Sequence, residues 1–103
     1  MPAYLIFDMQ QVTKPELLGQ YRAGVMATVK QFGGRYLDVG GQATPIEGNY
    51  KPAFSVIIEF PTAKHARDWY DSAEYKSLKS IRHEATRGTA YLLEAAPWSG
   101  ESL

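Results

Sequence analysis

At 103 residues the chain has the length of a single domain with one core, and its hydrophobic content of 45% and charged content of 21% are those of an ordinary globular protein. Eleven basic and eleven acidic residues give a formal net charge of zero, which disfavours a protein that mainly holds nucleic acid, because such a protein needs a cationic surface. The lack of cysteine excludes disulfides, thiolate nucleophiles and cysteine-based metal sites.

Targeting and membrane signals are not evident in the sequence. The start, Met1-Pro2-Ala3-Tyr4, lacks the basic region and long apolar run of a signal peptide. No apolar stretch approaches the ~20 residues that a membrane span requires. We therefore expect a cytoplasmic protein with no membrane partner.

The first third of the chain predicts a strand and then an amphipathic helix. Residues 3–9, AYLIFDM, are rich in strand-forming residues and too short for a helix. Thr13 and Glu16 have the spacing of a helix capping box. Apolar side chains then recur every three or four residues up to Phe32, and Gly33-Gly34 supplies a left-handed stop.

The middle of the chain predicts two strands separated by a long loop. Residues 35–39, RYLDV, form the first strand, and Gly40-Gly41 ends it. Residues 54–60, FSVIIEF, form the clearest strand, because four apolar side chains alternate along one of its faces. The loop between them is rich in glycine and proline.

Two short helices and a last strand complete the predicted elements. Thr62 and Ser72 are N-cap residue types, which predicts helices near 63–70 and 73–86. Residues 88–94, GTAYLLE, then predict the closing strand.

This order, βαββαβ, is that of the α+β ferredoxin-like fold. Right-handed crossovers place the helices on one face of a four-stranded antiparallel sheet. Since the strands carry apolar residues on both faces, the other face needs a cover, and the same face of a second copy can provide it. We therefore predict a homodimer built from one domain over residues 1–95, followed by a tail over residues 96–103.

Arg82 is the candidate site residue whose role depends most on its surroundings. On an ideal helix it lies close in angle to Tyr75, at the shoulder of the apolar stripe that should face the sheet. A charge at such a position is either paired or meets a ligand anion, because burying it alone is costly. A salt bridge with Asp8 or Glu59 and a ligand contact are both open at this point.

Aromatic side chains gather at the expected break between the two short helices. The favoured interpretation of Trp69, Tyr70 and Tyr75 is that they belong to the core or to a dimer interface. The second interpretation is a ligand cleft, in which backbone N–H groups left free at the helix break can hold an anionic or carbonyl group. Ser72 is expected to cap its helix rather than act as a nucleophile, since no triad partner can be argued. Tyr36 can add a hydroxyl to the same pocket, as can Tyr4.

The remaining ionisable residues predict no metal centre. His65 and His83 have no second histidine or carboxylate at metal-ligand spacing on the same face. Asp8, Asp38 and Glu59 fall inside strands, and any of them that faces the enclosed side of the sheet could serve as a base with a raised pKa. The sequence does not decide which of them does, so catalytic residues stay unassigned, and we expect no metal and no cofactor.

Several blocks, in the right order over roughly residues 1–95, resemble one known family. They include PAYLIFDM, TKPE, Tyr21-Arg22, GGRYL and IEFP, and the most specific is WYDSAEY, from Trp69 to Tyr75, with Arg82 after it. In these features the chain is similar to the family known as domain of unknown function 1330, of the dimeric α/β-barrel superfamily. The resemblance implies the ferredoxin-like fold and a dimer, and it implies no activity.

The sequence departs from the usual pattern of that family at two positions. Val39 and Phe54 stand where members of the family commonly have arginine, whereas Arg35 and Arg82 are kept. If those arginines contribute to an anion site, this chain has lost part of it.

The wider superfamily includes haem-degrading monooxygenases, cofactor-independent quinone-forming monooxygenases and muconolactone-type isomerases. The haem-binding histidine of the first group would fall near Lys79, and a protonated lysine has no lone pair to ligate iron. Lys79 therefore argues against haem binding, which stays the less favoured alternative.

Together these observations predict a homodimer with a small-molecule pocket between sheet and helices, and no nucleic-acid partner. The expected ligand-binding residues are Tyr36, Trp69, Tyr75 and Arg82, with Asp8 or Glu59 nearby. If the protein is an enzyme, we expect cofactor-independent acid/base or monooxygenase-like chemistry on a small aromatic or carbonyl compound. The alternative is a non-catalytic dimeric binding or structural module, in which the same residues form the core and the interface.

Overall fold

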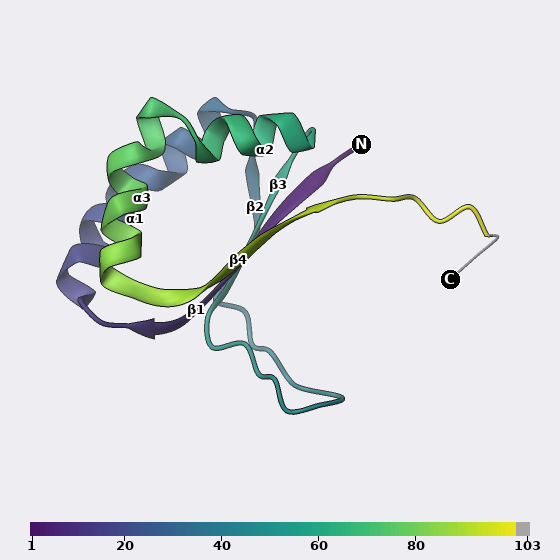
Figure 1. Ribbon diagram of the computed structural model, residues 1–103, viewed down its shortest axis with the longest axis horizontal. Coiled ribbons are helices and arrows are strands. Elements are labelled where there is room, and N and C mark those ends of the chain that lie inside the picture. Colours follow the sequence, from purple (N-terminus) through teal and green to yellow (C-terminus); the bar gives the residue numbers. More distant parts are fainter. Residues whose placement is uncertain (101–103) are drawn as a thin grey trace.

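A computed structural model describes residues 1–100, in which a four-stranded antiparallel sheet carries its helices on one face (Figure 1). The elements in chain order are β1 (Ala3–Val12), α1 (Pro15–Gln31), β2 (Arg35–Val39), β3 (Ser55–Phe60), α2 (Ala63–Tyr70), α3 (Ala73–Ala85) and β4 (Thr86–Glu94). The strands lie in the order β2-β3-β1-β4. This confirms the predicted ferredoxin-like βαββαβ arrangement, with α2 and α3 together forming the second helical connection. Within the described residues, no helix has the length and apolarity needed to cross a membrane.

The strands β1 and β4 are longer than predicted. They pair antiparallel from Ala3 opposite Glu94 to Val12 opposite Thr86, with a bulge between Met9 and Gln11. Pairing with β4 extends β1 beyond its apolar residues. The local sequence of β1 does not reveal this partner, so the extension could not be predicted from it. The strand β3 begins one residue later than predicted, at Ser55.

The predicted capping box at the start of α1 is wrong. The N-cap residue is Lys14, and its side chain makes no capping hydrogen bond. The Thr13 hydroxyl instead donates to the backbone oxygen of Glu84, and the amides of Thr13 and Lys14 both donate to the backbone oxygen of Ala85. These bonds hold the end of β1 against the end of α3. Because the Thr13 hydroxyl is used there, it does not cap α1.

The other predicted helix ends are confirmed. The Thr62 hydroxyl accepts a hydrogen bond from the amide of His65, and the Ser72 hydroxyl accepts one from the amide of Tyr75. Gly33 adopts a φ of 81°, the left-handed conformation that favours glycine after a helix.

The hydrophobic core lies between the helices and the inner face of the sheet. Trp69 and Tyr75 are fully buried, and their ring centroids are 4.0 Å apart. The indole N–H of Trp69 donates to the Thr28 hydroxyl at 3.0 Å, so this large side chain is buried without an unpaired polar atom. The contact fixes the break between α2 and α3 against α1.

The other face of the sheet carries apolar side chains that no described helix covers. Strand pairing places Ile57, Ile6 and Tyr91 in one row across β3, β1 and β4, and it places Tyr4 beside Leu93 in a neighbouring row. We call these five residues the outer face. Tyr91 is 58% exposed and Leu93 is 50% exposed, so this apolar surface is open to a partner.

Candidate ligand-binding cavity

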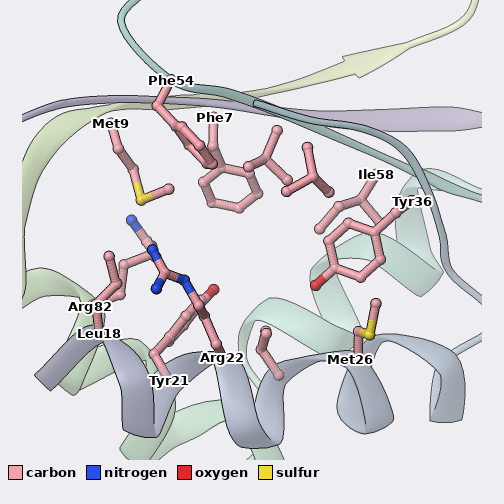
Figure 2. Close-up of a pocket in the computed structure, with 13 residues that line it drawn as sticks. Phe7, Met9, Leu18, Tyr21, Arg22, Met26, Tyr36, Phe54, Ile58 and Arg82 are labelled. Carbon is pink, nitrogen blue, oxygen red and sulfur yellow. The ribbon is translucent and has the colours of Figure 1, made fainter. Parts of the chain in front are cut away.

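A cavity of about 270 Å³ lies between the inner face of the sheet and α1 (Figure 2). Its walls are mostly apolar, with Phe7, Phe54 and Ile58 among the side chains that the strands contribute. Its polar groups come from Tyr21 and Arg22 on α1, Tyr36 on β2 and Arg82 on α3. The structure thus places a cavity where the sequence predicted a pocket, between sheet and helices.

Arg82 is a buried cation held by neutral partners. The residue is only 9% exposed. Its Nε donates a hydrogen bond to the Tyr75 hydroxyl at 3.2 Å, and its guanidinium carbon lies 5.0 Å from the ring centroid of Phe7. One terminal nitrogen lies 3.2 Å from His83 Nε2. None of the ion pairs among residues 1–100 includes Arg82. The possible salt bridges of Arg82 with Asp8 and Glu59 therefore do not form.

Tyr75 connects Arg82 to a second tyrosine. The hydroxyls of Tyr75 and Tyr21 are 2.8 Å apart, and the Tyr75 hydroxyl already accepts from Arg82. The proton of this buried hydroxyl needs an acceptor, and Tyr21 is the acceptor that the described residues offer. The Tyr21 hydroxyl then keeps its own proton for the cavity that it lines.

The tyrosines of the cavity are hydrogen-bond donors at neutral pH. Burial, together with the nearby Tyr75, raises the pKa of Tyr36 to about 12. Burial also raises the pKa of Tyr21 far above its ordinary value. Neither phenol is therefore a base near pH 7, and with two arginines beside them the polar lining is suited to an anion.

Asp8 does not lie at the cavity, and the prediction that placed it near the pocket is wrong. Strand alternation directs its neighbours Phe7 and Met9 into the cavity and Asp8 to the opposite side of the sheet. There its carboxylate accepts hydrogen bonds from the backbone amides of Ala53 and Phe54, at 2.9 and 3.1 Å. It also accepts hydrogen bonds from the side chains of Tyr50 and Gln10. Asp8 therefore anchors the loop that ends at the cavity wall.

These hydrogen bonds set the ionisation of Asp8. Its burial alone would raise the pKa, but the bonds from Tyr50 and from the two amides outweigh it, and the pKa lies below its usual value. Asp8 is thus an anchored carboxylate and not a base with a raised pKa.

The other strand acids are also away from the cavity. Glu59 lies opposite Tyr4 on the far side of the sheet and pairs with Arg35 at 2.6 Å. The Asp38 carboxylate accepts a hydrogen bond from the Ser55 hydroxyl at 2.8 Å. The placement of Glu59 near the pocket is therefore wrong, and Arg35 is not a cavity cation. Tyr4, which shares that face, adds no hydroxyl to the cavity either.

The four remaining candidates divide into two groups. Tyr36 and Arg82 line the cavity, whereas Trp69 and Tyr75 are fully buried beneath it. Tyr75 reaches the site only through its hydroxyl bond to Arg82. The aromatic pair at the helix break is thus core, as the first reading of these residues predicted.

The sequence reasoning missed Tyr21 and Arg22 as cavity residues. Tyr21 fits the apolar stripe of α1, so its position suggested core packing, but Tyr21-Arg22 is one of the blocks that carry the family resemblance, and that signal could have singled it out. Val39 and Phe54 also line the cavity. These are the two positions at which the resemblance led us to expect arginine, and the side chains present there make this wall of the cavity apolar.

Comparison with known proteins gives a family and a fold. The sequence model of the family described as Domain of unknown function (DUF1330) matches residues 2–96. No protein of curated function matches the chain.

Solved structures share the architecture. A protein of unknown function from Rhodopseudomonas palustris is 15% identical, with 93% of this chain and 83% of that chain covered and a TM-score of 0.73. SnoaB, a cofactor-independent oxygenase from Streptomyces nogalater, is 13% identical, with 97% and 96% covered and a TM-score of 0.55. A dimeric protein of unknown function and ferredoxin-like fold from Bacteroides fragilis is 15% identical, with 91% and 95% covered and a TM-score of 0.59. At such identities the likeness shows the fold alone.

Proposed function

The chain belongs to the family described as Domain of unknown function (DUF1330), whose description gives no activity. From the cavity itself we propose that it binds a small, largely apolar molecule carrying one anionic group. The observation that carries the proposal is Arg82, a residue 9% exposed with no acidic partner among residues 1–100. A buried guanidinium without a counter-charge costs stability, and a ligand anion would offset that cost.

The rest of the lining supports an anionic ligand. Tyr21, Arg22 and Tyr36 add two phenol donors and a second cation, and the residues that line the cavity include no carboxylate and no histidine. The protein therefore offers charge stabilisation but no side-chain base. A ligand that is already ionised at neutral pH fits this lining better than one that the protein must deprotonate.

A matched pair of probes tests the proposal. The benzoate and benzamide carrying a 4-isopropenyl group have the same shape and differ in charge, and calorimetric titration measures the affinity of each. We expect the benzoate to bind the unmodified protein at least about tenfold more tightly, the size of one charge-assisted hydrogen bond. Equal affinities would contradict the proposal.

Two variants locate the effect. Arg82→Met should abolish the preference for the benzoate, because it removes the buried charge and keeps an apolar stem over Phe7. Arg87→Gln removes one positive charge from an exposed residue outside this cavity, so it should keep the preference. A loss of preference in both variants would mean that overall charge, and not the cavity, selects the anion.

The same donors favour a second candidate function, the cofactor-independent stabilisation of an enolate, with the α proton passing to solvent because the cavity lining holds no side-chain base. Hydrogen-bond donors aimed at a developing anion lower the barrier to its formation. Exchange of the acidic C–H protons of 2-indanone with deuterium oxide, followed by NMR, tests this. Acceleration that Arg82→Met removes would support catalysis, and an unchanged exchange rate would leave the protein as a binder.

We also infer that the partner of the chain is a second copy, joined through the outer face. The five apolar residues of this face lie in adjacent rows of a regular sheet, which is the surface that an isologous contact needs. The protein from Bacteroides fragilis with a similar fold is described as dimeric, which supports this assembly.

A further inference from the structure

The polar groups of the cavity lie at two opposite ends. Figure 2 shows Arg82, Arg22 and Tyr21 on one side of the space, and Tyr36 across it with its hydroxyl directed toward the middle. The first group comes from α1 and α3, and Tyr36 comes from β2. The lining between them is apolar, so a molecule that fills the cavity meets polar groups only at its two ends.

The Tyr36 hydroxyl is a donor without an acceptor. Within residues 1–100, no side chain or backbone group forms a hydrogen bond with it; the residue is half-buried, but its hydroxyl is not one of the fully buried polar atoms, all of which are paired. Its burial raises the pKa to about 12, so the proton is retained at neutral pH. The hydroxyl is therefore open to the cavity, where an oxygen of the ligand can accept its proton in place of solvent.

The chemistry around Tyr36 limits what that oxygen can be. Its cross-strand neighbour is Ile58, and Met26 and Val39 also line the cavity, so no cation of the lining comes from β2 or β3. A second anion at this end would lack a counter-charge. A neutral acceptor, such as a carbonyl oxygen, needs only the single proton that Tyr36 supplies.

The apolar middle favours a flat, unsaturated body. Phe7 and Phe54 present rings to the cavity, and Met9 and Met26 present thioethers, which pack well against aromatic rings. We infer that the ligand is a planar aromatic acid with its anionic group at Arg82 and a carbonyl-type oxygen at Tyr36. This inference rests on the proposed function and adds the class of ligand.

The test uses two pairs of probes in calorimetric titration. The first pair is 4-acetylbenzoate and 4-isopropenylbenzoate, and the second is the longer 6-acetyl-2-naphthoate and 6-isopropenyl-2-naphthoate. Within a pair the charge is equal and the shape is similar, and a carbonyl oxygen in one compound replaces a methylene group in the other. We expect the acetyl compound of at least one pair to bind about 3- to 10-fold more tightly, as one neutral hydrogen bond allows.

Variants connect this preference to Tyr36. Tyr36→Phe should abolish the advantage of the acetyl compound and leave the affinity of the isopropenyl compound unchanged. Tyr91→Phe, which removes a hydroxyl from the outer face, should keep the advantage. Because the Tyr36 hydroxyl forms no hydrogen bond within the described protein, its removal should not affect folding.

The outcomes separate this inference from the proposed function. If the carboxylates bind in an Arg82-dependent manner without an acetyl preference in either pair, the two-ended ligand is wrong and anion binding stands. An acetyl preference that survives Tyr36→Phe also overturns the inference. If none of the four carboxylates binds, both the inference and the proposed function are overturned.

Discussion

The Nε of Arg82 donates to the hydroxyl of Tyr75 at 3.2 Å, and within residues 1–100 this buried cation has no carboxylate beside it. A neutral hydroxyl compensates a buried guanidinium much less than an anion does. The arrangement therefore retains a charge at a cost in stability, as is common where binding requires it.

Replacing Arg82 should accordingly affect binding more than folding. In Arg82→Met the desolvation cost disappears while Tyr75 keeps its bond to Tyr21, so the melting temperature should stay within about 4 °C of the unmodified protein or rise. Thermal unfolding followed by circular dichroism measures this. Phe60→Ala, which empties a fully buried core position, is the reference for structural damage and should cost about 3–5 kcal/mol. A fall of more than about 8 °C in Arg82→Met would identify Arg82 as a structural residue.

Alternation and helix caps made much of the fold predictable from the sequence. The apolar period of two in residues 54–60 predicted that Val56 and Ile58 share one face of β3, and in the structure both line the cavity. Thr62 and Ser72 predicted where α2 and α3 begin, because an N-cap acts on amides only three residues away. Local chemistry was enough in each of these cases.

The rest depended on contacts between distant parts of the chain. The residues on both sides of Asp8 are apolar, so alternation alone did not say which face the helices cover. The anchor of Asp8 lies at Ala53 and Phe54, more than forty positions away. Thr13 fitted a capping box but pairs with Glu84 of α3. Tertiary partners decided these positions, and no local pattern encodes them.

The anchored carboxylate of Asp8 predicts a pH-dependent contribution to stability. Its pKa is lowered in the folded protein, so the contribution is fully present above the unfolded pKa of about 3.9 and is lost as pH falls through the folded pKa. Asp8→Asn should cost about 1–3 kcal/mol at pH 7, because an amide cannot accept all four donors. Urea unfolding measures the difference, which should shrink as the pH is lowered below about 4.

A surface acid is the control for Asp8. Asp68 pairs with Lys64 on the exposed side of α2, and Asp68→Asn should change the free energy of unfolding by less than about 1 kcal/mol at any of these pH values. A cost in Asp8→Asn that is the same at pH 7 and at pH 3 would show that the ionised carboxylate is not what holds the loop.

The outer face predicts a charge-sensitive dimer. Ile57 lies in the row with Ile6 and Tyr91, so Ile57→Glu places a carboxylate, and its copy across the two-fold axis, in an apolar contact. Sedimentation velocity should give a dimer for the unmodified protein at micromolar concentration and a monomer for the variant.

The matched control is on the opposite side of the molecule. Met26 of α1 is 64% exposed and lies on the helical side of the sheet, so Met26→Glu should remain dimeric. A monomeric unmodified protein, or a dimer that persists in Ile57→Glu, would contradict pairing through the outer face.

Ser72 should be needed for stability and not for binding. Its hydroxyl accepts a hydrogen bond from the amide of Tyr75 at 3.1 Å and donates one to the backbone oxygen of Trp69 at 2.8 Å. It therefore connects the end of α2 to the start of α3. Ser72→Ala should lower the free energy of unfolding by about 1 kcal/mol, and Ser72→Asn, another good N-cap, should retain most of it. Well below the melting temperature, both variants should bind 4-isopropenylbenzoate as the unmodified protein does. A folded Ser72→Ala protein that fails to bind would show that the hydroxyl itself contacts the ligand.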